Sequence, residues 1–351
     1  MKYGKLGSSD ISISRLCMGT MTFGSYNTKE EGFAIMDYAF EHGINFFDSA
    51  EMYPTPPNKN TAHLTNKIIG EWIKQKNNRS KIIIADKIAG RSIPRNSVGW
   101  LRPTGEDTRL NKEQINFAID NSLKNLGIDY IDLYQLHWPD RLGNFFYGLE
   151  YKHKEDESIS IEETLSALEE NVKKGKIRHI GISNETAWGA SEFIKIAEKN
   201  NWTKITTIQN PYSLVNRSFE VGLAEICIRE KVGLLAYSPL AGGVLSGKYL
   251  DGKMPTKSRM SISKDRYPRY WTLNTEPAVK NYIAIAKKYG LDCCQMAIKF
   301  CEIQQFMSAV IIGATNLEQL KNNIQSINLE LTNEIIEDIN KVQLIYSNPC
   351  V

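Results

Sequence analysis

Short apolar runs alternate with longer amphipathic stretches along the whole chain. Eight of the runs are apolar on both faces and rich in Ile, Leu and Val, which is typical of parallel strands covered by helices. These runs span residues 15–19, 45–48, 82–87, 131–137, 177–183, 206–209, 233–238 and 309–312. Regular alternation of this kind predicts an α/β fold built around a parallel sheet.

The amphipathic stretches between these runs have the ends expected of helices. Residues 28–43, 111–127 and 160–175 each begin with Thr, Asn or Ser and stop at a glycine. The first residue has an acidic residue or Gln three positions later, the spacing of a capping box. Eight strands that are each followed by a helix predict a (β/α)8 TIM barrel.

The pattern predicts one domain over residues 1–351. Residues 1–14 read as a β-hairpin that caps the bottom of the barrel, residues 15–326 as the barrel itself, and 327–351 as an extra helix and tail. No composition shift marks a linker between two domains.

Three connections are too long to be simple turns. They span residues 88–110, 138–160 and 241–276, and each follows a predicted strand. Loops that follow strands lie on the C-terminal face of a barrel, where the active sites of TIM-barrel enzymes are found. We therefore expect these long loops to shape a site.

The amino-acid composition limits the classes of partner and the cellular compartment that we expect for this protein. The 351 residues carry a net charge of only +3, which argues against nucleic-acid or anionic-membrane binding. No run approaches the roughly 18 apolar residues of a membrane span. No apolar segment follows residues 1–5, so we expect no signal peptide. The six cysteines form no C-x-x-C pair, and the five histidines show no metal-binding spacing. We expect a cytoplasmic protein with reduced thiols and no metal site.

Ionisable residues end three successive predicted strands. They are Asp48, Lys87 and His137, and Tyr53 follows Asp48 on the first loop. Taken singly, each fits an ordinary loop residue or a rim ion pair. A barrel, however, brings strand ends together at its mouth, so the repeated position predicts one site.

An acid, a base and a phenol together at the mouth of the barrel favour a site that transfers a proton to or from an oxygen atom. Tyr53 is a poor acid at its reference pKa of about 10, and a nearby Lys87 ammonium would lower that pKa by about 1–3 units. Asp48 would keep a buried Lys87 charged. A neutral His137 could donate a hydrogen bond that orients a substrate oxygen.

Four motifs around these positions resemble the aldo-keto reductase superfamily. They read DSAEMY at 48–53, DLYQLHWP at 132–139, GKIRHIGISN at 175–184 and IGAT at 312–315. The likeness extends from about residue 3 to about residue 345. The stretches IQNPYSL at 208–214 and NRSFEVGL at 216–223 look most similar to the bacterial Tas branch of that superfamily.

The resemblance implies a catalytic tetrad of Asp48, Tyr53, Lys87 and His137, with Tyr53 as the general acid. It also implies a nicotinamide cofactor across the barrel mouth. The positions that match the cofactor contacts of the family are Ser183, Asn184, Gln209, Tyr237, Ser238, Pro239, Leu240, Ala241, Gly243, Lys248, Arg259, Gly313, Thr315, Gln319 and Asn323. Tyr237 would stack on the nicotinamide ring.

The same comparison favours NADPH over NADH. Lys248 and Arg259 match basic positions that relatives use on the adenosine phosphate. Gly313 and Gln319 depart from the pattern, because many single-chain reductases carry Lys and Arg there. A further departure is Asp86, which stands beside Lys87 where the family usually carries Ser or Thr. Side-chain alternation along a strand should direct Asp86 away from Lys87, towards the helices.

We therefore expect NADPH-dependent reduction of an aldehyde or ketone, with a small carbonyl compound as the partner. The alternative is a redox-sensing module that binds the cofactor and acts through a protein partner, as potassium-channel β subunits do. A barrel hydrolase or lyase that binds no nicotinamide is a third possibility. The sequence identifies neither the substrate nor the oligomeric state.

Overall fold

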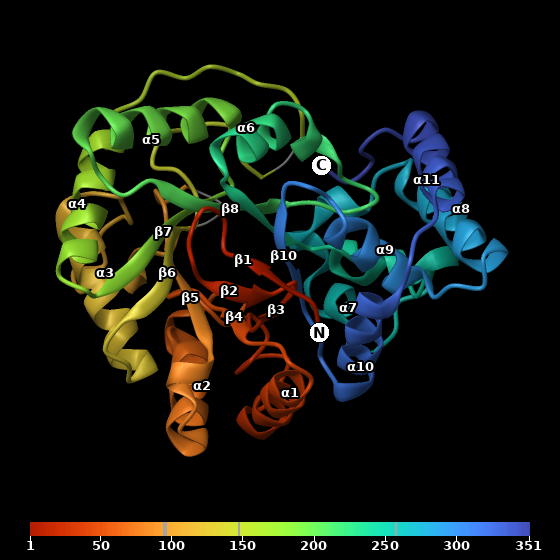
Figure 1. Cartoon of the computed structure of the whole chain (residues 1–351), viewed down its shortest axis with the longest axis horizontal. Coiled ribbons are helices and arrows are strands. Elements are labelled where there is room, and N and C mark those ends of the chain that lie inside the picture. Colours follow the sequence, from red (N-terminus) through yellow and green to blue (C-terminus); the bar gives the residue numbers. More distant parts are fainter. Residues whose placement is uncertain (94–96, 147, 257) are drawn as a thin grey trace.

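Eight parallel strands close into a barrel in the computed structural model, which describes residues 1–93, 97–146, 148–256 and 258–351. Around the barrel the strands follow the order β10-β3-β4-β5-β6-β7-β8-β9 (Figure 1). Their bounds are β3 Leu16–Gly19, β4 Phe46–Asp48, β5 Ile83–Ile88, β6 Ile131–Leu136, β7 Ile177–Ser183, β8 Ile205–Pro211, β9 Gly233–Tyr237 and β10 Met307–Ile312. The predicted TIM barrel is confirmed.

Helices cover the outside of this barrel. They are α1 Lys29–Glu41, α2 Leu64–Lys76, α3 Lys112–Leu126, α4 Ile161–Lys173, α5 Ala187–Asn200, α6 Leu223–Glu230, α9 Cys293–Glu302 and α10 Leu317–Gln325. The predicted helix starts are confirmed, since Thr28, Asn111 and Ser160 accept hydrogen bonds from the backbone three residues on. Such caps satisfy amides that a helix leaves unpaired, and the covering helices bury the apolar outer faces of the strands.

The N-terminal hairpin closes the amino end of the barrel. Its strands, β1 Tyr3–Lys5 and β2 Ser12–Ser14, pair antiparallel. Leu6, Ile11 and Ile13 are buried among the inward-facing side chains of the barrel strands. In addition, the amide of Gly7 donates to Ser308 Oγ at the start of β10. The hairpin therefore closes this end of the barrel, and the loops that follow the strands lie at the opposite end.

Additional helices lie outside the ring. They are α7 Arg259–Ser263, α8 Thr275–Lys288 and α11 Asn333–Ile345, and α8 packs against α11 (Figure 1). The 3-10 helices are η1 Lys59–Thr61, η2 Arg79–Lys81, η3 Gly99–Leu101, η4 Ser218–Glu220, η5 Ala241–Ser246, η6 Leu250–Gly252, η7 Lys264–Arg266, η8 Pro268–Tyr270 and η9 Ser326–Asn328. No helix of the described ranges is both long and apolar enough to cross a membrane.

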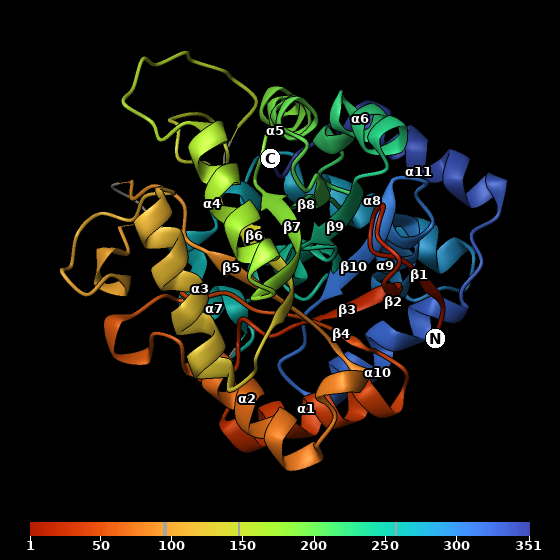
Figure 2. The same cartoon turned by 60° about the vertical axis from the view of Figure 1, so that its left-hand side comes forward.

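The three long connections are not uniform. The one between β9 and α8 is broken into short helical turns, whereas the one between β6 and α4 extends away from the body of the molecule (Figure 2). Residues 94–96, 147 and 257, which fall within the three connections, lie outside the described part of the chain. All three connections leave the carboxyl ends of strands, so they surround the open end of the barrel.

Candidate active site

The barrel brings the four predicted catalytic residues together. Asp48 ends β4, Lys87 lies near the end of β5, His137 directly follows β6, and Tyr53 lies on the loop after β4. The register of the sheet explains the convergence, because Asp48 pairs with Ala85 and Lys87 pairs with Gln135 on neighbouring strands. Residues separated by about ninety positions thus meet at one end of the barrel.

A short ion pair forms the centre of the site. Lys87 Nζ donates to Asp48 Oδ2 at 2.6 Å and to the carbonyl oxygen of Ser49 at 2.6 Å. The Lys87 side chain is fully buried and Asp48 is nearly so. A buried ammonium is tolerated only when its protons find acceptors of this kind.

Burial and charge act in opposite directions on the lysine and the phenol. Burial alone would lower the pKa of Lys87, but the charges of Asp48 and Tyr53 outweigh it and raise that pKa. The Lys87 ammonium lies 5.0 Å from the centre of the Tyr53 ring. Burial raises the pKa of Tyr53 and exceeds the lowering by Lys87. Lys87 therefore acts in the predicted direction, but the expected net fall in the pKa of Tyr53 is wrong, because desolvation is the larger effect.

His137 faces Tyr53 across the site. The two ring centres are 5.8 Å apart and the rings meet edge to face. Burial and then the Lys87 charge hold the pKa of His137 well below its usual value, so the imidazole is neutral at pH 7 as predicted. Its Nδ1 is buried without a hydrogen-bond partner among the described residues. A neutral imidazole retains one N–H that can donate to a substrate oxygen.

Two glutamines complete the surroundings of Asp48. Its Oδ1 accepts from Gln135 Nε2 at 3.1 Å and from Gln209 Nε2 at 2.8 Å. Sequence reasoning missed Gln135, although a polar residue two positions before His137 in an apolar strand shares its inward face. Gln209, expected at the cofactor, here supports the carboxylate that holds Lys87.

A second buried ion pair fixes the loop that carries Tyr53. Arg102 binds both carboxylate oxygens of Glu51 at 3.0 Å, and Glu51 Oε1 also accepts from the amide of Ala89 at 2.7 Å. Both side chains are almost completely buried. The pair joins the loop after β4 to the loop after β5. No sequence pattern predicts this pair, because Arg102 lies in a long connection without periodicity.

Asp86 points away from the tetrad, as the alternation along β5 predicts. Its Oδ2 accepts from Asn66 Nδ2 on α2 at 3.0 Å. The Ser122 hydroxyl on α3 interacts both with Asp86 and with the Tyr134 hydroxyl on β6. Burial is the main cause that raises the pKa of Asp86, from 3.8 to about 7.

The residues expected to hold a cofactor occupy the other half of the barrel mouth, from β7 to β10. Ser183 and Gln209 lie on β7 and β8, and Tyr237 ends β9. Asn184, directly after β7, links the ends of β6 and β9, because its Nδ2 donates to the carbonyl of His137 at 2.8 Å and its Oδ1 accepts from the Tyr237 hydroxyl at 2.7 Å. Ser183 Oγ donates to the Gln209 carbonyl at 2.7 Å. These polar groups therefore form one connected edge beside the tetrad.

The expected phosphate contacts follow this edge. Ser238 and Ala241 have positive φ angles of 57° and 50°. Gly242 and Gly243 also have positive φ angles, of 66° and 95°. Pro239 and Leu240 lie between these bends, and Lys248 Nζ lies beside Gly243, where a Cβ would approach it to 3.0 Å. The amides of Ala241 and Gly243 donate to the carbonyls of Ser238 and Leu240, so hydrogen bonds within the segment hold the bend.

The last turn is held by its own side chains. Thr315 donates to Gln319 Oε1 from both its amide and its hydroxyl, and Asn323 donates to the carbonyl of Gly313. A Cβ on Gly313 would meet no described atom within 4 Å. This turn leads into α10, whose N-terminus is capped by Asn316.

Arg259 lies on α7, near the first loop of the barrel. Its Nη2 is 2.9 Å from Met21 Sδ, and its guanidinium stacks on the Tyr267 ring at 5.1 Å. Arg259 Nε is buried and lacks a partner within the described chain. A buried guanidinium with an unpaired Nε, a lysine beside a bent glycine segment and a connected polar edge fit a phosphate-bearing nicotinamide cofactor.

Apolar side chains surround the phenol of Tyr53. Trp138 is buried beside it, and Met21, Trp100 and Phe146 pack partly buried against the same cluster. Trp138 also contacts His137, with ring centres 5.2 Å apart. Aromatic and thioether groups therefore pack around the tetrad.

Comparison with known proteins agrees with this geometry. The model of the Aldo/keto reductase family matches residues 15–344. The chain is 45% identical over 350 residues to Protein tas of Escherichia coli (strain K12), covering 99% of both chains. The chain belongs to the aldo/keto reductase family. It is therefore an oxidoreductase, and its membership implies NAD(P)H-dependent carbonyl reduction.

More distant relatives of this aldo-keto reductase differ in what their names state. An L-glyceraldehyde 3-phosphate reductase of Escherichia coli (strain K12) is 29% identical over 335 residues, covering 93% of this chain and 88% of that protein. A probable voltage-gated potassium channel subunit beta of Arabidopsis thaliana is 29% identical over 356 residues, covering 99% and 98%. Proteins named as an enzyme and as a probable channel subunit are thus both similar to this chain over most of its length.

Proposed function

We propose that this aldo-keto reductase uses NADPH to reduce an apolar aldehyde or ketone to the alcohol. The observation that carries the proposal is the buried contact of Lys87 with Asp48, set 5.0 Å from the Tyr53 ring and opposite a neutral His137. This arrangement suits protonation of a carbonyl oxygen, the step that must accompany hydride addition to the carbonyl carbon.

Tyr53 is the general acid in this proposal. The raised pKa of Tyr53 keeps the phenol protonated at pH 7, so that its proton is available. Lys87 stabilises the phenolate once the proton has left, and Asp48 holds Lys87 in place and charged. His137 donates to the substrate oxygen and orients it. When bound, a nicotinamide supplies the hydride.

Ser183, Asn184, Gln209 and Tyr237 would position the nicotinamide. Because Gln209 Nε2 donates to Asp48, we assign its cofactor contact to the carbonyl oxygen of its side chain. Ser238 to Ala241 and Gly243 would follow the pyrophosphate. Gly313, Thr315, Gln319 and Asn323 would flank the adenosine end. Lys248 and Arg259 would bind the extra phosphate that distinguishes NADPH from NADH.

The walls of the site favour an apolar substrate. Met21, Trp100, Trp138 and Phe146 offer aromatic and thioether surface next to Tyr53 and His137. Burial of an aromatic or branched aliphatic carbonyl compound against this surface would remove apolar area from water. We therefore expect benzaldehyde derivatives to be reduced more efficiently than small hydroxyaldehydes.

The first test follows NADPH oxidation with a nitrobenzaldehyde as the substrate, for the wild type and for Tyr53→Phe. Turnover should fall by about 10²–10⁴-fold in the variant, because the general acid is lost. NADPH binding, measured by quenching of protein fluorescence, should remain. Tyr134→Phe is the matched control, since Tyr134 is another buried tyrosine and lies on the outer side of the barrel wall near Asp86.

The outcomes separate the alternatives. Full turnover in Tyr53→Phe would overturn its role as the acid. Tight NADPH binding without turnover on any carbonyl would favour a sensor that acts through a partner. Absence of NADPH binding would overturn both functions. Lys248→Ala and Arg259→Ala should raise the KM for NADPH more than the KM for NADH.

A further inference from the structure

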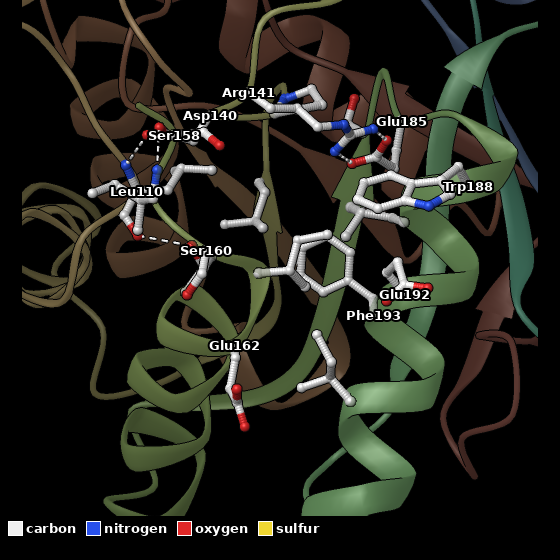
Figure 3. Close-up of a pocket in the computed structure, with 18 residues that line it drawn as sticks. Leu110, Asp140, Arg141, Ser158, Ser160, Glu162, Glu185, Trp188, Glu192 and Phe193 are labelled. Carbon is white, nitrogen blue, oxygen red and sulfur yellow. Dashed lines mark hydrogen bonds and ion pairs between the residues drawn. The ribbon is translucent and has the colours of Figure 1, made fainter. Parts of the chain in front are cut away.

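A cavity of about 310 Å³ lies outside the barrel wall, between the first turns of α4 and α5. Figure 3 shows α4 with Ser160 and Glu162 on one side and α5 with Trp188, Glu192 and Phe193 on the other. Arg141 and Glu185 close the end near the barrel mouth. None of the four catalytic residues lines this cavity, although Ser183, which we assign to the nicotinamide, borders it.

The floor of the cavity is apolar. Leu110, Leu136, Ile161, Ile182, Phe193 and Ile196 line it. A volume of about 310 Å³ is at the lower end of the range of small-molecule pockets, about 300–1,000 Å³. The size therefore suits one small apolar group rather than a protein segment.

An exposed tryptophan forms one wall. Trp188 has 59% of its surface exposed, which is unusual for the largest apolar side chain. The Arg141 guanidinium lies 4.9 Å from the centre of its indole and binds the Glu185 carboxylate through both Nη atoms. Arg141 is thereby neutralised by Glu185, and its charge is not available to attract an anion.

Acidic side chains dominate the remaining charge. Four carboxylates line the cavity, from Asp140, Glu162, Glu185 and Glu192, against the single cation Arg141. Arg109 pairs with Asp140 at 2.8 Å from outside the lining. Two carboxylates then remain, Glu162 on the α4 side and Glu192 on the α5 side (Figure 3).

The ion-pair partners of these two carboxylates are exposed lysines, and Glu162 also accepts from Asn200 Nδ2 at 3.2 Å. Lys195 lies 2.8 Å from Glu192, and Lys199 lies 4.0 Å from Glu162, with 68% and 74% of their side chains exposed. Surface pairs of this kind contribute little, so a ligand cation can replace a lysine at small cost. The start of α4 does not favour an anion, because Ser160 caps it and Glu162 and Glu163 occupy its first turn.

We propose that this pocket binds a small organic cation, namely an amine carried on an aromatic or branched apolar body. The body would lie on the floor against Phe193 and Trp188, and the ammonium would reach Glu192. Trp188 and Glu192 are four residues apart on α5, so they present an aromatic face and a carboxylate on the same side of the helix.

The test uses three probes of equal shape and different charge: phenylpropylamine, phenylpropanol and phenylpropanoate. Binding to the wild-type protein is measured by isothermal titration calorimetry without NADPH or carbonyl substrate. The amine should bind about tenfold more tightly than the alcohol, and the carboxylate should bind most weakly. The assay does not depend on reductase activity, so failure of the proposed function would leave this result unaffected.

Two variants locate the binding. Glu192→Gln should remove the advantage of the amine over the alcohol, whereas Trp188→Ala should weaken both probes. Glu198→Gln is the matched control, because Glu198 lies on α5 outside the lining and pairs with Lys204. All three side chains are at least partly exposed, so the variants should fold, which circular dichroism verifies.

Three results would overturn the proposal. They are absence of amine binding to the wild type, equal affinity for the three probes, and an amine affinity that neither Glu192→Gln nor Trp188→Ala changes. The last result would assign the probe to another place on the protein.

Discussion

The two faces of strand β5 each carry a buried ionisable side chain, a lysine on one and an aspartate on the other, and the two differ in their hydrogen-bond partners. Lys87 faces the barrel interior and Asp86 faces the helices α2 and α3, and both side chains are fully buried. Lys87 donates to two oxygen atoms at 2.6 Å. Asp86 accepts from Asn66, and its interactions with Ser122 and the Lys87 backbone only partly offset its burial. Burial disfavours both charges, so the strength of the partners decides which group stays ionised.

The two faces are nevertheless connected by hydrogen bonds. Ser49 accepts from Lys87 through its carbonyl and donates its hydroxyl to Asn66 Oδ1. Asn66 in turn donates to Asp86 Oδ2. Variants along this path show whether the inner face works independently of the outer one.

Loss of the inner charge should have the largest effect. Lys87→Met leaves the Asp48 carboxylate buried without its cation, which should cost about 3–5 kcal/mol of unfolding free energy. Turnover with NADPH and a benzaldehyde should fall by about 10²–10⁴-fold, because Tyr53 loses the charge that stabilises its phenolate.

A second buried lysine provides the control. Lys299 on α9 pairs with Glu302 at 2.7 Å and is 4% exposed, far from the barrel mouth. Lys299→Met should lower stability and leave turnover unchanged. The double variant Asp48→Asn/Lys87→Met should regain stability without regaining turnover. Recovery of activity in that double variant would contradict a catalytic role for the pair.

Removal of the outer charge should change how stability depends on pH. Between about pH 4 and pH 7 the folded protein keeps Asp86 protonated while the unfolded chain releases the proton, since the pKa rises from 3.8 to about 7. The free energy of unfolding therefore falls as the pH rises from about 4 to about 7, because the unfolded chain gives up the Asp86 proton more readily than the folded protein does. The full loss is about 4 kcal/mol at ~1.4 kcal/mol per pKa unit.

Asp86→Asn should remove that loss. Urea unfolding of both proteins from pH 4 to pH 8 gives the difference between their unfolding free energies. The contributions of the other titrating groups cancel in this difference. The unfolding free energy of the variant should increase relative to that of the wild type as the pH rises, and most of this increase should occur below about pH 7. A constant difference across the range would mean that Asp86 is ionised in the folded protein.

Loss of the Asn66 side-chain amide, which connects the two faces of β5, should have a smaller effect on stability and turnover. Asn66→Ala leaves the Ser49 hydroxyl and Asp86 without this partner, which should cost about 1–3 kcal/mol. Turnover should change little, because the amide of Ser49 still donates to the Ala85 carbonyl at 2.9 Å and keeps the backbone in place. Asn281→Ala, at an exposed site on α8, should change stability by less than about 0.5 kcal/mol. A large loss of turnover in Asn66→Ala would show that the two faces are coupled.

Strand β5 also shows what the sequence can and cannot predict. Alternation along the strand predicts that Lys87 faces inward and Asp86 outward, because side-chain direction follows from backbone geometry alone. The barrel and the convergence of Asp48, Lys87 and His137 follow from the same periodicity. The net direction of the pKa of Tyr53 does not, since it depends on the degree of burial in three dimensions. Likewise, the Glu51–Arg102 pair arises between loops whose conformation no periodicity encodes.

The smallest expected effect is the most direct test of the separation between the two faces. Asp86→Ser should leave the upper limb of the pH profile of kcat/KM unchanged. That limb reports loss of the proton from Tyr53, whose pKa is set by burial and by the charges of Lys87, Asp48 and Tyr267. Asp48→Asn provides the contrast, because the Asp48 charge raises the pKa of Tyr53 and its removal should move the limb to lower pH. The profile should therefore respond to a carboxylate on the inner face and not to one on the outer face. A shift of the limb in Asp86→Ser comparable to that in Asp48→Asn would show that the outer charge reaches Tyr53 through Lys87.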